Sequence, residues 1–215
     1  MRRLYLVALA ALIAPAAGAA ETASFLNIGA GARALGMGGA HTALADDANA
    51  LYWNPAGLSA LEKREATAGH AELASNARHD FLGYAHPTPQ GTFAAGLTYL
   101  SQPDIEGRDA LGRKTGDFSA SDVAVSLGYG RKTTPADLGA AVKYIRSHIA
   151  QAEAQTFAVD VGARKRLGVV VLGAALRNAG PGLKYDGQRD DLPLRLALGA
   201  ARTFTGGHAV AAEFV

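Results

Sequence analysis

Beyond Arg64, bulky apolar residues stand at every second position of the sequence, with small or polar residues between them. The pattern is clearest in the stretches 93–99 (FAAGLTY), 123–130 (VAVSLGYG), 157–162 (FAVDVG) and 194–199 (LRLALG). Alternate side chains of a β-strand point to opposite faces, so a period of two predicts strands with one bulky apolar face and one small or polar face. The chain is therefore expected to be all-β.

Alternation alone also fits a soluble β-sandwich, which has a dry inner face and a wet outer face. The lengths favour a membrane protein, because the segments run to roughly ten residues, enough for a tilted strand to cross hydrocarbon, whereas ordinary strands average about five or six. We predict an antiparallel transmembrane β-barrel, partial in this chain, with about nine strands. They are expected near 64–72, 77–87, 91–101, 120–132, 136–148, 154–166, 167–178, 193–204 and 208–215.

The predicted connections alternate between short and long, as in an up-and-down barrel with short turns on one rim and longer loops on the other. Tight turns are expected at 87–91, 133–137, 164–168 and 205–207, and long polar loops at 102–119 and 179–192. The hairpin at 149–153 fits less well because it lacks Gly and Pro, which two strands extending beyond the membrane would explain.

Four tyrosines stand near the ends of predicted strands: Tyr84, Tyr99, Tyr129 and Tyr144. Aromatic side chains at these positions form girdles at the two membrane interfaces of β-barrels. Burial in a core is the alternative interpretation.

Residues 1–20 have the three parts of a secretory signal peptide. Arg2 and Arg3 form a basic start, 4–14 is almost wholly apolar, and 15–20 holds small residues and one proline. Export together with the strand pattern predicts the cell outer membrane, with membrane lipid and the barrel-assembly machinery as partners.

Charge and cysteine content exclude several functions. Removing the signal peptide takes away two arginines and no acid, so 21 basic and 19 acidic residues become 19 of each. A neutral chain has no basic field for nucleic acid. The chain has no cysteine, which excludes disulfides, thiolate metal sites and a cysteine nucleophile.

The sequence offers little to an enzymatic interpretation. Gly29, Gly31 and Ala34 satisfy a relaxed dinucleotide-binding fingerprint, but no parallel βαβ pattern follows them. The histidines lack metal-site spacing, and there is neither a Gly-x-Ser-x-Gly elbow nor a pair of carboxylates. We predict no enzyme, no catalytic residue, no cofactor and no metal; an outer-membrane lipase that assembles Ser and His from distant strands is the alternative.

The segment 21–62 differs from the rest and is expected to form a plug inside the barrel. Its glycines at 29, 31, 36, 38 and 39 allow close approaches and unusual backbone conformations. Asp46 and Asp47 are placed to cap a short helix over about 48–53. Pro55 disfavours helical geometry at Asn54, so a bend is expected there before a second short turn over 56–61.

This segment closely resembles the amino-terminal region of the FadL-like outer-membrane proteins, above all the PorV/PorQ branch. The resemblance rests on GARALGMGGA at 31–40, ALADD at 43–47 and YWNPAGL at 52–58, in that order. It covers about forty residues, a length and order that chance rarely supplies. The resemblance implies a hatch in the lumen, with Asn54, Pro55 and Ala56 matching its NPA element. A structural role is expected for Gly36, Gly38, Gly39, Asp46, Asp47, Trp53, Asn54, Pro55 and Ala56.

The resemblance implies one of two functions. The FadL branch implies uptake of hydrophobic small molecules through a lumenal pocket, and the PorV branch implies binding exported proteins and handing them onward in type IX secretion. The glycine-rich run and the YWNPAGL box favour the second branch. A hatch rich in inward apolar residues would favour ligand transport instead.

The strand count departs from the family, which closes with about fourteen strands where this chain is expected to supply about nine. An open edge in lipid leaves unpaired backbone groups. We therefore expect an odd number of strands with unpaired edges, and a truncated, non-functional product is a further alternative.

Overall fold

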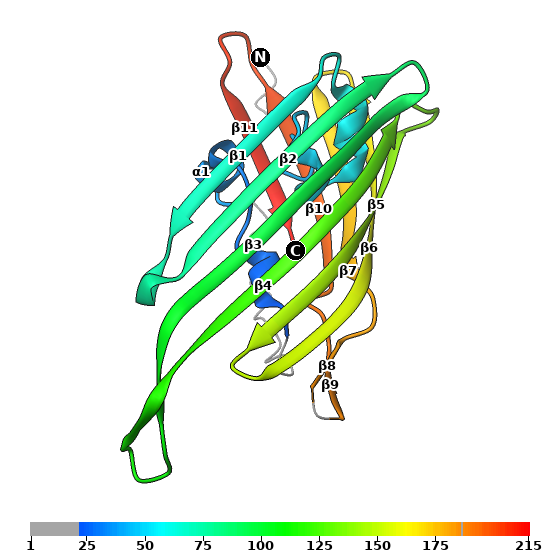
Figure 1. The fold of residues 1–215 in the computed structure, drawn as a ribbon. Coiled ribbons are helices and arrows are strands. Elements are labelled where there is room, and N and C mark those ends of the chain that lie inside the picture. The colour runs from blue at the N-terminus through cyan, green and yellow to red at the C-terminus, as the bar shows by residue number, and fades with distance from the viewer. Residues whose placement is uncertain (1–21, 186) are drawn as a thin grey trace.

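The computed structural model describes residues 22–185 and 187–215. The predicted signal peptide at 1–20 lies outside the described residues. The predicted all-β class is confirmed: nine strands form a single antiparallel sheet in the order β1-β2-β3-β4-β5-β6-β7-β10-β11 (Figure 1). Its strands are β1 (Glu65–Glu72), β2 (Arg78–Thr88), β3 (Gly91–Arg108), β4 (Lys114–Arg131), β5 (Asp137–Ile149), β6 (Ala152–Leu167), β7 (Val170–Ala179), β10 (Arg195–Thr203) and β11 (Ala209–Phe214).

Within this sheet, each strand pairs with the strand that follows it in the chain, and β7 pairs with β10 because β8 and β9 lie outside the sheet. This is an up-and-down topology. Within the described residues β1 pairs with β2 alone and β11 with β10 alone, so these two strands are the sheet edges. The odd number of strands and the two edges agree with expectation.

The alternation of side-chain size decides which face of each strand turns inward. On β6, Phe157 is 65% exposed and its neighbour Ala158 is 1% exposed. The same two-residue period of burial runs along β5 and β6. Bulky side chains thus cover the outer face, and small or polar ones cover the inner face.

Two predicted loops contain strand instead. Most of 102–119 continues β3 and β4 into a long hairpin arm whose turn spans 109–113. Pairing breaks between Gln102 and Ile105, where Asp104 has φ 55°, and then resumes. The polar composition misled the prediction because both faces of the arm are largely exposed and need no apolar residues. Within 179–192, β8 (Leu183–Tyr185) and β9 (Gln188–Asp190) form a small second sheet.

The hairpin at 149–153 is a tight turn despite its lack of glycine. Ala150 takes the left-handed conformation, φ 54°, and its N–H donates to the carbonyl oxygen of Ser119 at 3.1 Å. This bond to β4 compensates a conformation that costs a non-glycine residue energy.

Short helices precede the sheet and lie within its curve (Figure 1). They are η1 (Ser24–Asn27), α1 (Ala32–Gly36), α2 (Ala50–Trp53) and η2 (Pro55–Ala60), with η3 (Ala74–Asn76) between β1 and β2. No helix among the described residues is both long and apolar enough to cross a membrane. We call residues 22–62 the hatch segment; its buried apolar side chains and those of the inner face share two main clusters.

Candidate functional site

Asn54 fastens the hatch segment to the sheet. Its backbone is extended, φ −160° and ψ 102°, as Pro55 predicts, and its side chain is fully buried. The side-chain N–H groups donate to the carbonyl oxygens of Thr42, at 2.8 Å, and of Ala163 on β6, at 3.3 Å. Asn54 Oδ1 accepts the N–H of Ala56 at 3.1 Å. The NPA element is therefore a bonded junction between hatch and wall.

The wall beneath this junction is made of glycine. Gly130, Gly139 and Gly162 lie opposite one another on β4, β5 and β6, and we call them the glycine floor. A Cβ on Gly130 would stand 2.6 Å from the carbonyl oxygen of Pro55, and one on either other glycine would overlap Pro55 or Asn54. Only a wall without side chains lets the NPA backbone approach so closely.

Two aromatic residues of α2 hold the first part of the hatch segment. The Tyr52 hydroxyl donates to the carbonyl oxygen of Leu26 at 2.6 Å and accepts the N–H of Gly29 at 2.8 Å. Burial raises the pKa of Tyr52 to about 12, so the phenol keeps its proton. Trp53 Nε1 donates to the carbonyl oxygen of Ala30 at 2.7 Å, and the two rings meet edge to face.

Asp46 and Asp47 were both predicted to cap the short helix, but they have different roles in the structure. The helix begins at Ala50 instead of near Ala48, and the carboxylate of Asp47 accepts the N–H of Asn49, one residue before it, at 2.9 Å. Asp46 does not cap the helix; it forms an ion pair with Arg33 at 2.6 Å. The basic partner lies far off in sequence, so a local capping pattern could not show it.

The glycines of the GARALGMGGA run also differ among themselves. Gly38 and Gly39 have positive φ, 66° and 83°, and end α1 through N–H bonds to Leu35 and Ala34. Gly36 has an ordinary backbone, and a Cβ there would meet open space. The expected structural need for glycine is thus absent at Gly36.

The inner face carries a buried polar network that was not predicted from the sequence. Lys143 on β5 and Asp160 on β6 form an ion pair at 2.7 Å, with side chains 5% and 0% exposed. Lys143 Nζ also donates to Asn178 Oδ1 at 2.7 Å, and Asp160 Oδ1 accepts the N–H of Asn178 at 2.8 Å. Alternation places Lys143 and Asp160 inward, which was the available signal.

Asn178 reaches this network because β7 carries a bulge. Between the pairs Val159–Ala179 and Val161–Leu176, β7 has one more residue than β6, and Asn178 takes φ 61°. A bulge sets two residues opposite one, so Arg177 and Asn178 are both buried. The sequence around 177–178 contains no signal that predicts this bulge.

A cavity of about 320 Å³ lies between the hatch segment and the inner face. Two arginines, two aromatic side chains, one carboxylate and backbone from the glycine-rich run line it: Asn27, Gly38, Gly39, Ala40, Tyr52, Trp53, Arg177, Arg195, Glu213 and Val215. The Arg177 guanidinium lies 5.2 Å from the centre of the Trp53 ring, within cation–π range. Trp53 was a predicted site residue, and the arginines were missed.

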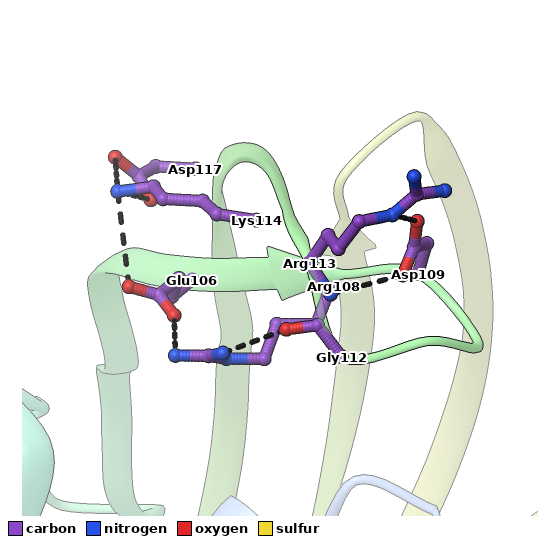
Figure 2. A network of polar contacts seen from close by, with 7 residues as sticks. All are labelled: Glu106, Arg108, Asp109, Gly112, Arg113, Lys114 and Asp117. Atoms are coloured by element: carbon purple, nitrogen blue, oxygen red, sulfur yellow. Dashed lines mark hydrogen bonds and ion pairs between the residues drawn. The ribbon is translucent and has the colours of Figure 1, made fainter.

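The hairpin arm carries a second polar network, which Figure 2 shows from close by. Arg113 Nε pairs with Asp109 at 2.8 Å, Lys114 with Asp117 at 2.9 Å, and Arg108 with Glu106. The N–H and guanidinium of Arg113 hold the pKa of the Asp109 carboxyl below its ordinary value. These exposed pairs shape the turn and contribute little to global stability.

The fold and site define a class of protein: a long-stranded antiparallel sheet curved around an amino-terminal hatch that is bonded to its inner wall. The family model described as type IX secretion system protein PorV matches residues 16–208. The chain belongs to this family. The match spans the hatch segment and the strands β1 to β10, and it ends just before β11, well beyond the residues that carry the motif. No curated protein matches the chain.

Proposed function

We propose that the chain is an outer-membrane component of type IX secretion, with the sheet in lipid and the hatch segment closing its interior. The observation that carries the membrane position is the apolar outer face. Large exposed apolar side chains recur on neighbouring strands at Leu82, Val125, Leu127, Val142, Phe157, Val159, Val161, Leu172, Leu196 and Leu198. Such a continuous face is what a lipid-facing wall requires.

Aromatic residues on the outer face support the same position. Phe93 and Tyr129 meet at 4.9 Å on one level, and Tyr144 and Phe157 meet at 5.3 Å on another. Tyr84, Phe93 and Tyr99 are exposed and not buried in a core. Exposed aromatic side chains on the outer face fit interfacial girdles.

The hatch segment supports a secretion role over uptake of hydrophobic molecules. Its large apolar side chains, such as Phe25, Leu51 and Leu58, are fully buried in packing. The cavity beside it combines three charged side chains, Arg177, Arg195 and Glu213, with the rings of Tyr52 and Trp53. A hydrophobic substrate needs a mostly apolar pocket, so handling of exported proteins fits better. This role requires no catalysis.

Deletion and complementation of the gene in the source bacterium test the proposal. We expect the chain in the outer-membrane fraction, and we expect type IX cargo to accumulate inside cells that lack it. Uptake of hydrophobic compounds should not change. Normal cargo release from the deletion strain, or a chain found only in the soluble fraction, contradicts the proposal. Loss of uptake with normal secretion would favour the FadL-type alternative.

A further inference from the structure

Two arginines face each other across neighbouring strands inside the sheet. Arg177 on β7 and Arg195 on β10 are directly opposite in register, and both line the cavity. Like charges at directly opposed positions repel each other and destabilise a sheet. A stable fold with this pair therefore calls for negative charge close to both guanidinium groups.

The protein supplies little of that negative charge. Among residues 22–185 and 187–215, neither arginine belongs to an ion pair. Arg177 is only 8% exposed, and its Nε has no hydrogen-bond partner among the described residues. A buried guanidinium donor without a partner is costly.

The neighbouring carboxylates have other partners. Asp160 pairs with Lys143 and accepts the N–H of Asn178. Glu213, which lines the cavity, accepts the N–H of Thr42 at 2.8 Å. Among the described side chains that line the cavity, Arg177 and Arg195 are cationic and Glu213 is the one carboxylate. An anion is therefore the ligand whose charge complements the two guanidinium groups.

We propose that Arg177 and Arg195 form a binding site for the carboxylate of a small ligand in this cavity. Guanidinium groups present forked donors that match the two oxygens of a carboxylate. The cavity volume of about 320 Å³ is that of a small-molecule pocket. Tyr52 and Trp53 give it aromatic walls for the rest of the ligand. The site goes beyond the secretion role and is tested without transport.

Trp53 gives a local readout, because it is the single tryptophan of the chain and carries Arg177 over its ring. The purified full chain in detergent is titrated with benzoate, with neutral benzamide and with inorganic phosphate while Trp53 fluorescence is recorded. We expect a saturable change with benzoate. Benzamide and phosphate should bind at least about tenfold more weakly, because benzamide lacks the charge and phosphate lacks both the planar carboxylate and a ring to pack on the aromatic walls.

The variant Arg195→Gln should weaken benzoate at least about tenfold, because it removes one charged fork. Its matched control is Arg202→Gln, on the same strand but exposed and stacked on Phe204 instead. The control should bind as the parent does. Arg195→Lys keeps the charge, and a loss of several-fold in this variant assigns the effect to the fork if Arg195→Gln fails to fold.

Three results would overturn the site: no saturable response to benzoate, equal affinity for benzamide, or undiminished affinity in both Arg195 variants. Phosphate binding more tightly than benzoate would overturn the assignment to a carboxylate. Cargo release in the deletion experiment is measured separately, so failure of the secretion role leaves these results unaffected.

Discussion

The backbone of Gly162 lies directly against the side-chain oxygen of Asn54, so closely that a Cβ on Gly162 would overlap Asn54 Oδ1. Gly162 belongs to the wall and Asn54 to the hatch segment, 108 residues earlier in the numbering. The asparagine bonds and the glycine floor are two halves of one junction. The hatch segment is held by shape as well as by hydrogen bonds.

Gly162→Ala should loosen this junction. Overpacking a tight contact costs about 1–3 kcal/mol, because side chains and backbone must shift. Thermal unfolding in detergent, followed by circular dichroism and by Trp53 fluorescence, measures the loss. Gly69→Ala on β1 is the matched control, since a Cβ there meets open space. Equal stability of the two variants would contradict the close fit.

Asn54→Ala should release the NPA element. It leaves the carbonyl oxygens of Thr42 and Ala163 without their buried donor, which costs about 1–3 kcal/mol. Limited proteolysis should then cleave the hatch segment sooner than in the parent. Gln151→Ala, in the exposed β5–β6 turn, should leave the cleavage rate unchanged. An intact hatch in Asn54→Ala would show that packing alone holds it.

Lys143→Met should destabilise the fold by about 3–5 kcal/mol, because it leaves the Asp160 charge buried without its counter-ion. The double variant Lys143→Met, Asp160→Asn should recover much of that loss, since it removes both charges and keeps an acceptor for Asn178. Arg146→Met breaks the exposed pair with Glu153 and should change the unfolding midpoint little. If the losses of unfolding free energy in the two single variants simply added in the double variant, Lys143 and Asp160 would not be energetically coupled.

His41 should make stability depend on pH. The His41 side chain is fully buried. Neither of its ring nitrogens has a hydrogen-bond partner among the described residues. Burial lowers its pKa below the ordinary 6.5, although Asp47, Asp46 and Glu213 oppose this and Arg33 adds to it. The unfolded chain therefore takes up the proton first. Stability is complete above pH 6.5 and declines as the pH falls below it.

Unfolding midpoints between about pH 7.5 and 5.5 test this, with His41→Phe as the comparison. Phenylalanine keeps an aromatic ring against Trp53, which His41 meets edge to face at 6.1 Å between centroids. The parent should lose more stability than the variant on acidification. Parallel pH profiles would assign the dependence to other groups.

Leu127→Lys tests the lipid-facing wall. Leu127 is 58% exposed on the outer face of β4, between the two aromatic levels, and a lysine at mid-membrane depth costs about 2–4 kcal/mol. We expect less protein in the heat-modifiable, membrane-inserted form on a gel. Leu111→Lys at the tip of the hairpin arm, 77% exposed, should insert normally. Equal insertion would argue against lipid at Leu127.

Much of the fold could be predicted because its cause is local. The period of two marked every strand of the sheet, and Pro55 marked the extended Asn54. The ends of β3 and β4 were missed because an arm with two exposed faces carries no such period. Within the candidate site, Asn54 and Trp53 were identified from the motif, whereas Arg177 and Arg195 were not.

The sequence by itself determined the strands, the face each one turns inward and the bend before the NPA element, since each follows from neighbouring residues. Only the tertiary structure decided which glycines meet Asn54 and Pro55, and that Asp46 pairs with Arg33 instead of capping a helix. It also decided the bulge that brings Arg177 and Asn178 inward together. The contacts of Asn54 and Pro55 join residues far apart in the chain, and the bulge depends on how β7 pairs with β6. Local pattern does not record strand register, so neither could be predicted from neighbouring residues.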